Sequence, residues 1–149
     1  MKEPAVTDSS CLIVLERVDQ LELLPALFHP LLASPTVRDE FSSQPEWLQV
    51  QAPSNTALVN VLRLIMGEGE AEAIALAIER QYLLILDDRK ARTWAKRLGI
   101  RLIGTAGILV RAKRAGLLGA VRPILEDMEV AGFRMSPQLK QEVLRLAGE

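Results

Sequence analysis

The side chains best suited to chemistry in this 149-residue sequence are carboxylates at a few separated points. Asp8 follows a short apolar segment, and Asp87 and Asp88 follow the apolar run YLLIL. Glu70 comes directly after Gly69, at the start of an alanine-rich segment. Carboxylates gathered in one cleft repel each other unless a hard divalent cation such as Mg²⁺ or Mn²⁺ neutralises them. If these acids meet, they predict a metal site with oxygen ligands.

Each acid also has an ordinary structural interpretation. The aspartates could be helix N-caps. Glu70 and Glu72 could be first-turn acids favoured by the helix dipole, and Glu40 could be merely solvated. No single acid decides between the two interpretations. Their joint placement, after predicted strands and at predicted helix starts, favours the metal site.

The remaining composition limits the other kinds of site. One cysteine and one histidine exclude an internal disulfide and a Cys/His zinc site within one chain. The net charge of −1 does not indicate a nucleic-acid binder, but no acid interrupts the basic residues between positions 89 and 114. Arg89, Lys90 and Arg92 are nearest to the acids and could meet phosphates. Alternatively, these cations are the solvated faces of two helices.

The elements that must position the acids alternate between short apolar runs and helical periods, which predicts an α/β fold with a mostly parallel central sheet. Pro, Gly and capping residues set the expected ends of the elements. Strands are expected at 4–7, 31–33, 47–51, 82–88 and 100–104. Helices are expected at 9–15, 21–28, 55–65, 89–98, 108–115, 118–129 and 137–146, with two more beginning near 34 and 66.

Two of these helices carry candidate acids. The alanine-rich one after position 66 has Ala71, Ile74, Ala75 and Ile78 on one stripe, which predicts burial. The one near position 34 would have Glu40 in its early turns, where the dipole favours an acid. In open parallel sheets the working groups gather beyond the carboxyl ends of the strands. We therefore expect the acids to converge there.

Length and hydropathy predict a single domain over 1–149, located in the cytoplasm. A chain of this size can bury one hydrophobic core. It contains no apolar run of about 18 to 20 residues, so no membrane span is expected. The first residues, MKEPAVTDSS, lack the basic and apolar pattern of a secretory signal.

Five segments carry a resemblance that covers nearly the whole chain: AVTDSSCLIVLERVDQLELL, SPTVRDEF, GEGEAEAIALAIE, LLILDDRKARTWAKRLG and IRLIGTAGILVRAKRAGLL. In this order they resemble the PIN-domain family, and within it the toxin-like (VapC-like) ribonucleases of prokaryotes. The resemblance implies a three-layer α/β/α fold. It also implies catalytic acids at Asp8, Glu40, Glu70 and Asp87.

By the same resemblance, Asp8, Glu70 and Asp87 would hold Mg²⁺ or Mn²⁺, with Glu72 and Asp88 as second choices. The metal would position a water for in-line attack on an RNA phosphodiester bond. Thr105 would support the site by a hydrogen bond, unless it only caps the next helix. The basic residues Arg89, Lys90 and Arg92 would bind RNA. The protein would be a homodimer and the toxin of a type II toxin-antitoxin pair, with a cognate antitoxin protein as partner.

Two other classes compete with this nuclease. One is a PIN-like module that binds RNA or a protein with weak or absent catalysis, for which metal would have no effect on RNA turnover. The other is a phosphoacceptor receiver domain. Receivers place their paired acids after the first strand and need a lysine after a late strand. Here the pair lies at Asp87 and Asp88, and RLIGTAG has no lysine, so the order of features argues against a receiver.

Overall fold

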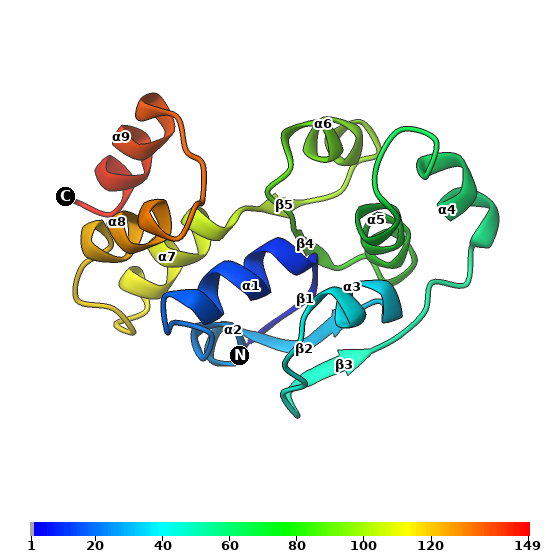
Figure 1. Ribbon diagram of the computed structural model, residues 1–149, viewed down its shortest axis with the longest axis horizontal. Coiled ribbons are helices and arrows are strands. Elements are labelled where there is room, and N and C mark those ends of the chain that lie inside the picture. Colours follow the sequence, from blue (N-terminus) through cyan, green and yellow to red (C-terminus); the bar gives the residue numbers. More distant parts are fainter. Residues whose placement is uncertain (1) are drawn as a thin grey trace.

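The computed structural model describes residues 2–149, and its centre is a sheet of five parallel strands (Figure 1). The strands lie in the order β3-β2-β1-β4-β5. Their bounds are β1 Glu3–Thr7, β2 Phe28–Ala33, β3 Leu48–Val50, β4 Leu83–Ile85 and β5 Leu102–Ile103. The predicted α/β class with a parallel sheet is confirmed.

The helices connect these strands and cover both faces of the sheet. In chain order they are α1 Ser9–Arg17, α2 Leu23–Leu27, α3 Pro35–Glu40, α4 Thr56–Leu62, α5 Glu68–Arg80, α6 Arg89–Arg97, α7 Thr105–Arg114, α8 Arg122–Val130 and α9 Pro137–Leu146. No helix within residues 2–149 is both long and apolar enough to cross a lipid bilayer.

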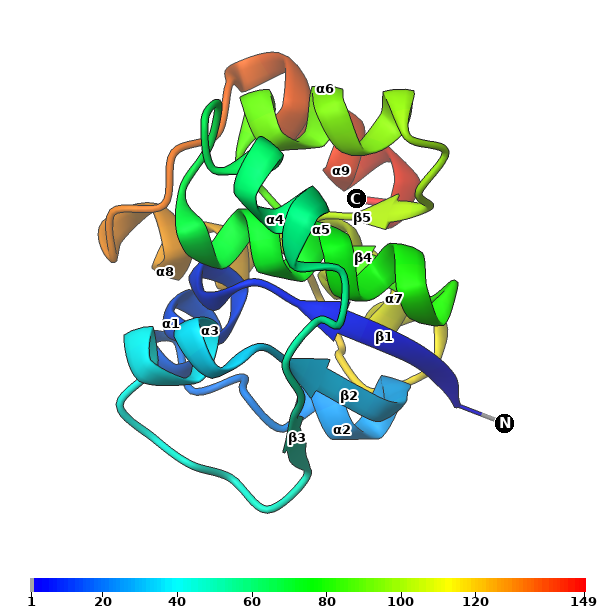
Figure 2. The same cartoon turned by 90° about the vertical axis from the view of Figure 1, so that its right-hand side faces the viewer.

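Two separate cores form because side chains alternate between the faces of a strand. Ala5 and Ile85 point into a core built with α1, α7, α8 and α9. Val6 and Leu84 point into a second core built with α4, α5 and α6. The two helix groups lie on opposite sides of the sheet in Figure 1. Figure 2 shows α4 and α5 lying across the strands on the second side. The result is the predicted three-layer α/β/α arrangement.

The structure differs from expectation at the ends of several elements. The helix expected to end at residue 28 ends at Leu27, because Phe28 is extended and buries its ring as the first residue of β2. The helix α7 begins at Thr105 rather than at residue 108, since the Thr105 amide donates to the side chain of Asp87 in the loop after β4. The helix α8 begins at Arg122 rather than at residue 118, and Pro123 occupies its first turn.

The strand order also fixes where a site can form. The chain builds outward from β1 to β2 and β3 on one side, and to β4 and β5 on the other. Ligands of open parallel sheets bind beyond the carboxyl ends of the strands, at the point where the order reverses. In this protein that point lies between β1 and β4.

Candidate active site

Two acidic segments leave the sheet side by side where the strand order reverses. The last residues of β1 and β4, Thr7 and Ile85, are register partners. The next residue after β1 is Asp8, and its amide donates to the Ile85 carbonyl at 3.1 Å. Asp87 and Asp88 follow two and three residues after Ile85. The three aspartates therefore lie at one edge of the sheet because parallel pairing aligns the ends of their strands.

Asp8 is the most deeply buried of the acids, with 5% of its surface exposed. It stands at the N-cap position of α1, but its side chain accepts no capping hydrogen bond. Burial raises the pKa of Asp8 to about 6, and repulsion from Glu40, Asp87 and Asp88 adds to the effect. A hydrogen bond from the Ser9 backbone lowers this pKa only in part, and no cation is among its causes, so the carboxylate is suited to bind one.

Glu70 reaches the same place from the first turn of α5. It is half-buried and lines one cleft together with Asp8, Asp87 and Asp88. Burial raises the pKa of Glu70 to about 7, and repulsion from Asp8, Asp88 and Glu40 adds to the effect. The pKa values of Asp8 and Glu70 are thus raised by the same two causes, burial and repulsion from nearby carboxylates.

Asp87 is held in place by the start of α7. The Thr105 backbone N–H donates to Asp87 Oδ1 at 2.8 Å, and the buried Thr105 hydroxyl donates to Oδ2 at 2.5 Å. A Cβ atom at Gly104 would lie only 2.9 Å from Asp87 Oδ1. Position 104 must therefore lack a side chain for Asp87 to take this orientation. Thr105 contacts the acid directly, and it is the first residue of α7 rather than its cap.

Asp88 has a structural role in addition to any role in chemistry. Its Oδ2 accepts a hydrogen bond from the Ala91 amide at 2.9 Å and caps α6. The neighbouring Arg92 donates from Nη1 to the Leu86 carbonyl at 2.6 Å, which ties the first turn of α6 to the end of β4. The cap uses one carboxylate oxygen, and Asp88 also lines the acidic cleft.

Glu40 lies in a different part of its helix from the one we expected. It is the last residue of α3, because Phe41 turns to an extended backbone and buries its ring. The macrodipole therefore disfavours an acid there, and the first-turn interpretation of Glu40 is wrong. Its exposed carboxylate lies against Gly69, where a Cβ would be 2.5 Å from Glu40 Oε1. Glu40 borders the cluster from α3, and Gly69 leaves room for it.

Glu72, the second choice beside Glu70, lies elsewhere. Its Oε2 accepts a hydrogen bond from the Thr36 hydroxyl at 2.8 Å. It lines a separate hollow between α3, α4 and α5 rather than the acidic cleft. Two residues along a helix correspond to more than half a turn, so Glu70 and Glu72 cannot face the same way.

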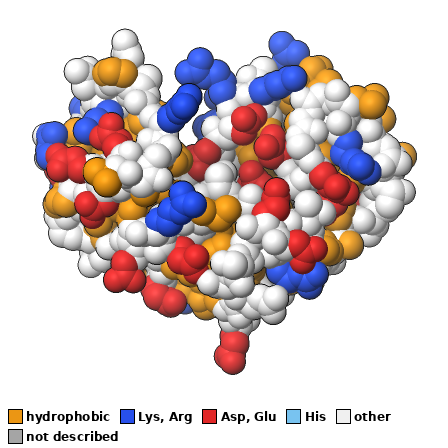
Figure 3. Space-filling view, viewed as in Figure 1, with side chains coloured by type: hydrophobic (Ala, Val, Ile, Leu, Met, Phe, Trp, Pro, Cys, Tyr) orange, Lys and Arg blue, Asp and Glu red, His pale blue; other side chains and the backbone are white. Residues whose placement is uncertain are grey.

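The acidic cleft is large and has an apolar wall. Its volume is about 720 Å³, and α9 contributes Leu139, Val143 and Leu146 to its lining. In Figure 3 acidic side chains gather in and around the hollow of the upper middle, with Lys and Arg side chains above it. The acids of the hollow are thus visible at the surface of the molecule.

The basic residues proposed for RNA binding do not all face this region. Arg92 lines the acidic cleft, and Arg89 and Arg92 line an adjoining cavity. Lys90 is exposed and lines neither. The structure adds two cations that the sequence did not single out, Lys96 of α6 and Arg134 of the loop between α8 and α9. Lys96 belongs to the basic run, but no sequence signal indicates that Arg134 returns to the acids of β4.

The donor set fits a hard divalent cation in its chemistry. Carboxylate oxygens are the ligands that Mg²⁺ and Mn²⁺ prefer. The raised pKa values of Asp8 and Glu70 also indicate that the cluster lacks a compensating positive charge. Within residues 2–149 no three Asp, Glu, His or Cys side chains are close enough to form a ready-made metal site. The case for a cation site therefore rests on the convergence of these carboxylates and on their charge. Side-chain rotations would have to bring three of them close enough to bind one cation.

Comparison with protein families identifies the fold independently of this geometry. The family model DUF3368, described as a PIN domain, matches residues 4–149. The match covers the sheet from Pro4 onward and includes Asp8, Glu40, Glu70, Asp87 and Asp88. The comparison with curated proteins gives no match.

Proposed function

The chain belongs to the PIN-domain family, whose members are typically nucleases, and on this basis we propose that it is a metal-dependent endoribonuclease. The observation that supports this most strongly is the joint rise in the pKa values of Asp8 and Glu70 in one cleft. PIN nucleases generally use divalent metal ions, and these acids are the ones with an uncompensated charge. Mg²⁺ or Mn²⁺ are the ions that we propose.

Asp8, Glu70 and Asp87 would hold the cation, with Asp88 and Glu40 at the border of the site. A bound divalent cation supplies Lewis-acid polarisation of a phosphoryl oxygen and a water that is easier to deprotonate. The chain's own contribution is to fix the acids: Thr105 orients Asp87, and the rigid ends of β1 and β4 fix Asp8. Arg92, anchored on the Leu86 carbonyl, would place positive charge beside the scissile phosphate.

The test is RNA cleavage by the purified protein with Mg²⁺, with Mn²⁺ and with chelator. We expect cleavage only with metal. Glu70→Gln should lower kcat by about 10²–10³-fold, the usual cost of removing one electrostatic contributor to a transition state. The matched control is Glu72→Gln on the same helix, which should keep nearly full activity. Full activity in chelator, or equal losses for Glu70→Gln and Glu72→Gln, would contradict the proposed site. Binding of RNA without cleavage under any metal would instead indicate a binding module.

We also propose that the protein is the toxin of a type II toxin-antitoxin pair and forms a homodimer. The support is the resemblance of its segments to toxin-like members of the family. The apolar side chains of Val61 on α4 and of Leu64 just after it, which are 60% and 84% exposed, would suit contact with another chain. A short neighbouring reading frame whose product inhibits the nuclease would support the pair, and a monomer in light scattering would contradict the dimer.

A further inference from the structure

A second cavity adjoins the acidic cleft and differs from it in charge. Its volume is about 560 Å³, and it lies between α6 and the loop that joins α8 to α9. The two hollows share five lining residues: Asp87, Asp88, Arg92, Arg134 and Leu139. They are therefore continuous at the acids of β4, and a chain-like ligand could occupy both.

Four cations face this second cavity from two sides. Arg89, Arg92 and Lys96 lie on one face of α6, because their spacing of three and four residues repeats with the helical turn. Arg134 comes from the loop on the opposite side. Among residues 2–149, no carboxylate lies within ion-pair distance of any of the four, although Asp87 and Asp88 line the same cavity. Their positive charge is available to a ligand.

The acidic cleft itself offers few cations. Among the residues that the structure describes, its only lysine or arginine side chains are Arg92 and Arg134, and both belong to the second cavity as well. The rest of the lining is carboxylate or mostly apolar. An anionic strand that reaches the acids can therefore find compensating charge in only one direction, toward α6 and the α8–α9 loop.

We propose that the basic cavity of Arg89, Arg92, Lys96 and Arg134 binds the phosphodiester backbone of the substrate strand next to the bond that is cut. This proposal rests on the proposed ribonuclease function, and it adds the direction of the strand and two residues, Lys96 and Arg134. Arg134 fixes the strand from the wall opposite α6. It is a binding residue that neither the basic run nor the family's acids indicate.

The extent of the cavity favours a polymer over a single phosphate. Arg89 and Lys96 are seven residues apart, which corresponds to about 10 Å along the helix axis. Cations spread over such a length can contact more than one phosphate of the same strand. Each contact that displaces a condensed counterion from a single strand steepens the salt dependence of binding, with a slope of about 0.7 in log–log form.

The test uses the full-length protein with Asp8→Asn, so that RNA is bound and not cut. Binding of a short fluorescent single-stranded oligouridylate is measured by anisotropy in chelator over a range of salt concentrations. Arg134→Gln and Lys96→Gln should each weaken binding and lower the salt slope by about 0.7. The matched control is Lys90→Gln, which removes the same charge from α6 outside both cavities. It should leave the slope nearly unchanged.

Two competitors identify the ligand class. Inorganic phosphate at matched ionic strength should displace the RNA no better than chloride, and polyglutamate should displace it poorly. Equal effects of Lys90→Gln and Arg134→Gln would overturn the proposal in favour of diffuse attraction. Tight polyglutamate binding that depends on Arg134 would overturn it in favour of an acidic protein partner.

The same variants without Asp8→Asn separate this proposal from the function on which it rests. If the parent protein cuts RNA but Arg134→Gln matches Lys90→Gln in KM and in salt slope, the basic cavity is wrong and the nuclease stands. If no RNA is cut with Mg²⁺ or Mn²⁺ but the binding loss at Arg134 and Lys96 persists, the nuclease is wrong and the cavity stands.

Discussion

The protein contains two carboxylate sites with opposite electrostatics, the acidic cleft at the end of β1 and the side chain of Glu149 beside α8. In the cleft, burial and like charge raise the pKa of Asp8 to about 6 and that of Glu70 to about 7. At the other site the pKa of Glu149 falls to about 2, because the Val121 amide donates to its carboxylate, with Lys113 and the Arg122 amide also contributing.

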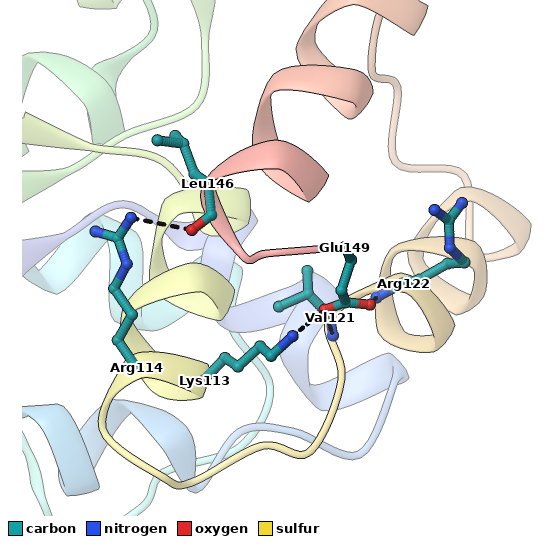
Figure 4. A network of polar contacts seen from close by, with 6 residues as sticks. All are labelled: Lys113, Arg114, Val121, Arg122, Leu146 and Glu149. Atoms are coloured by element: carbon teal, nitrogen blue, oxygen red, sulfur yellow. Dashed lines mark hydrogen bonds and ion pairs between the residues drawn. The ribbon is translucent and has the colours of Figure 1, made fainter.

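The contacts of Glu149 explain the difference (Figure 4). One oxygen accepts from the Val121 amide at 2.6 Å and from Lys113 Nζ at 3.0 Å, and the other accepts from the Arg122 amide at 3.1 Å. The side chain thereby caps the start of α8 and joins it to α7. Nearby, Arg114 donates to the Leu146 carbonyl and secures the end of α9.

The comparison separates carboxylates that stabilise the fold from carboxylates that await a ligand. Glu149 has its donors within the chain, so its charge favours the folded state. Asp8 has none that cap α1, and its neighbours in the cleft are mostly acids. A group of uncompensated buried charges costs stability, which is the mark of a site organised for binding rather than for folding.

The largest expected effect is on the pH dependence of stability in the metal-free protein. The folded pKa of Asp8 lies above its ordinary value of 3.8, so its proton stabilises the fold fully below that value. This stabilisation is lost as the pH rises through about 6. It is on the order of 3 kcal/mol for the deeply buried Asp8. Chemical denaturation between pH 4 and 8 in chelator should therefore show stability falling with pH. The fall should be smaller in the Asp8→Asn variant, in which Glu70 still titrates.

Glu149 should give the opposite sign at lower pH. Its folded pKa lies below the ordinary value of 4.5, so its contribution is present above that pH and is lost as the pH falls through about 2. In Glu149→Gln the loss of stability between pH 4.5 and 2 should be smaller than in the parent. Identical acid limbs in the two proteins would contradict the contrast between the two sites.

A middle-sized effect is expected at Thr105, which supplies the one side-chain hydroxyl donor to Asp87. Thr105→Val keeps the shape but removes a hydrogen bond to a charged group, which should cost about 1–2 kcal/mol in thermal unfolding. It should also lower activity by about tenfold, the low end for residues that orient a metal ligand. Thr105→Ser keeps the hydroxyl and is the control. A valine variant with wild-type activity would mean that Asp87 needs no orientation.

The smallest effect should be the change at Glu149 under neutral conditions. Glu149→Gln weakens the cap of α8 and its link to Lys113, so the melting temperature should fall. Glu142→Gln is the control, because its ion pair with Arg145 is exposed and such pairs contribute little. If the two variants melt alike, the Glu149 contacts do not stabilise the protein. The contrast between Glu149 and the acidic cleft would then be contradicted.

The sequence predicted much of this arrangement for identifiable reasons. The run YLLIL is apolar and too short for a helix, which predicts a buried strand, and β4 lies inside the sheet between β1 and β5. The alanine stripe of α5 is buried against β1 and β4, as its period indicated. Because parallel strands align their carboxyl ends, acids that follow two such strands could be expected to meet.

Other features depend on tertiary contacts that local patterns do not encode. The short α3 ends at Glu40 because Phe41 is buried in the core. Glu40 therefore lies at the end of the helix and not in its early turns, where the sequence predicted it. The start of α7 is set by Asp87 from a distant segment, and a run of helical residues could not reveal it. Arg134 reaches the acids only because the α8–α9 loop folds back toward α6.

The most direct test of the acidic cleft as a cation site is a pair of melting curves, for the parent protein and for Asp8→Asn, each with and without millimolar Mn²⁺. In chelator at neutral pH, Asp8→Asn should melt higher, because one buried charge is gone. Mn²⁺ should raise the melting temperature of the parent by mass action and leave that of Asp8→Asn nearly unchanged. A parent protein indifferent to Mn²⁺, together with an Asp8→Asn variant that melts no higher in chelator, would contradict the cation site.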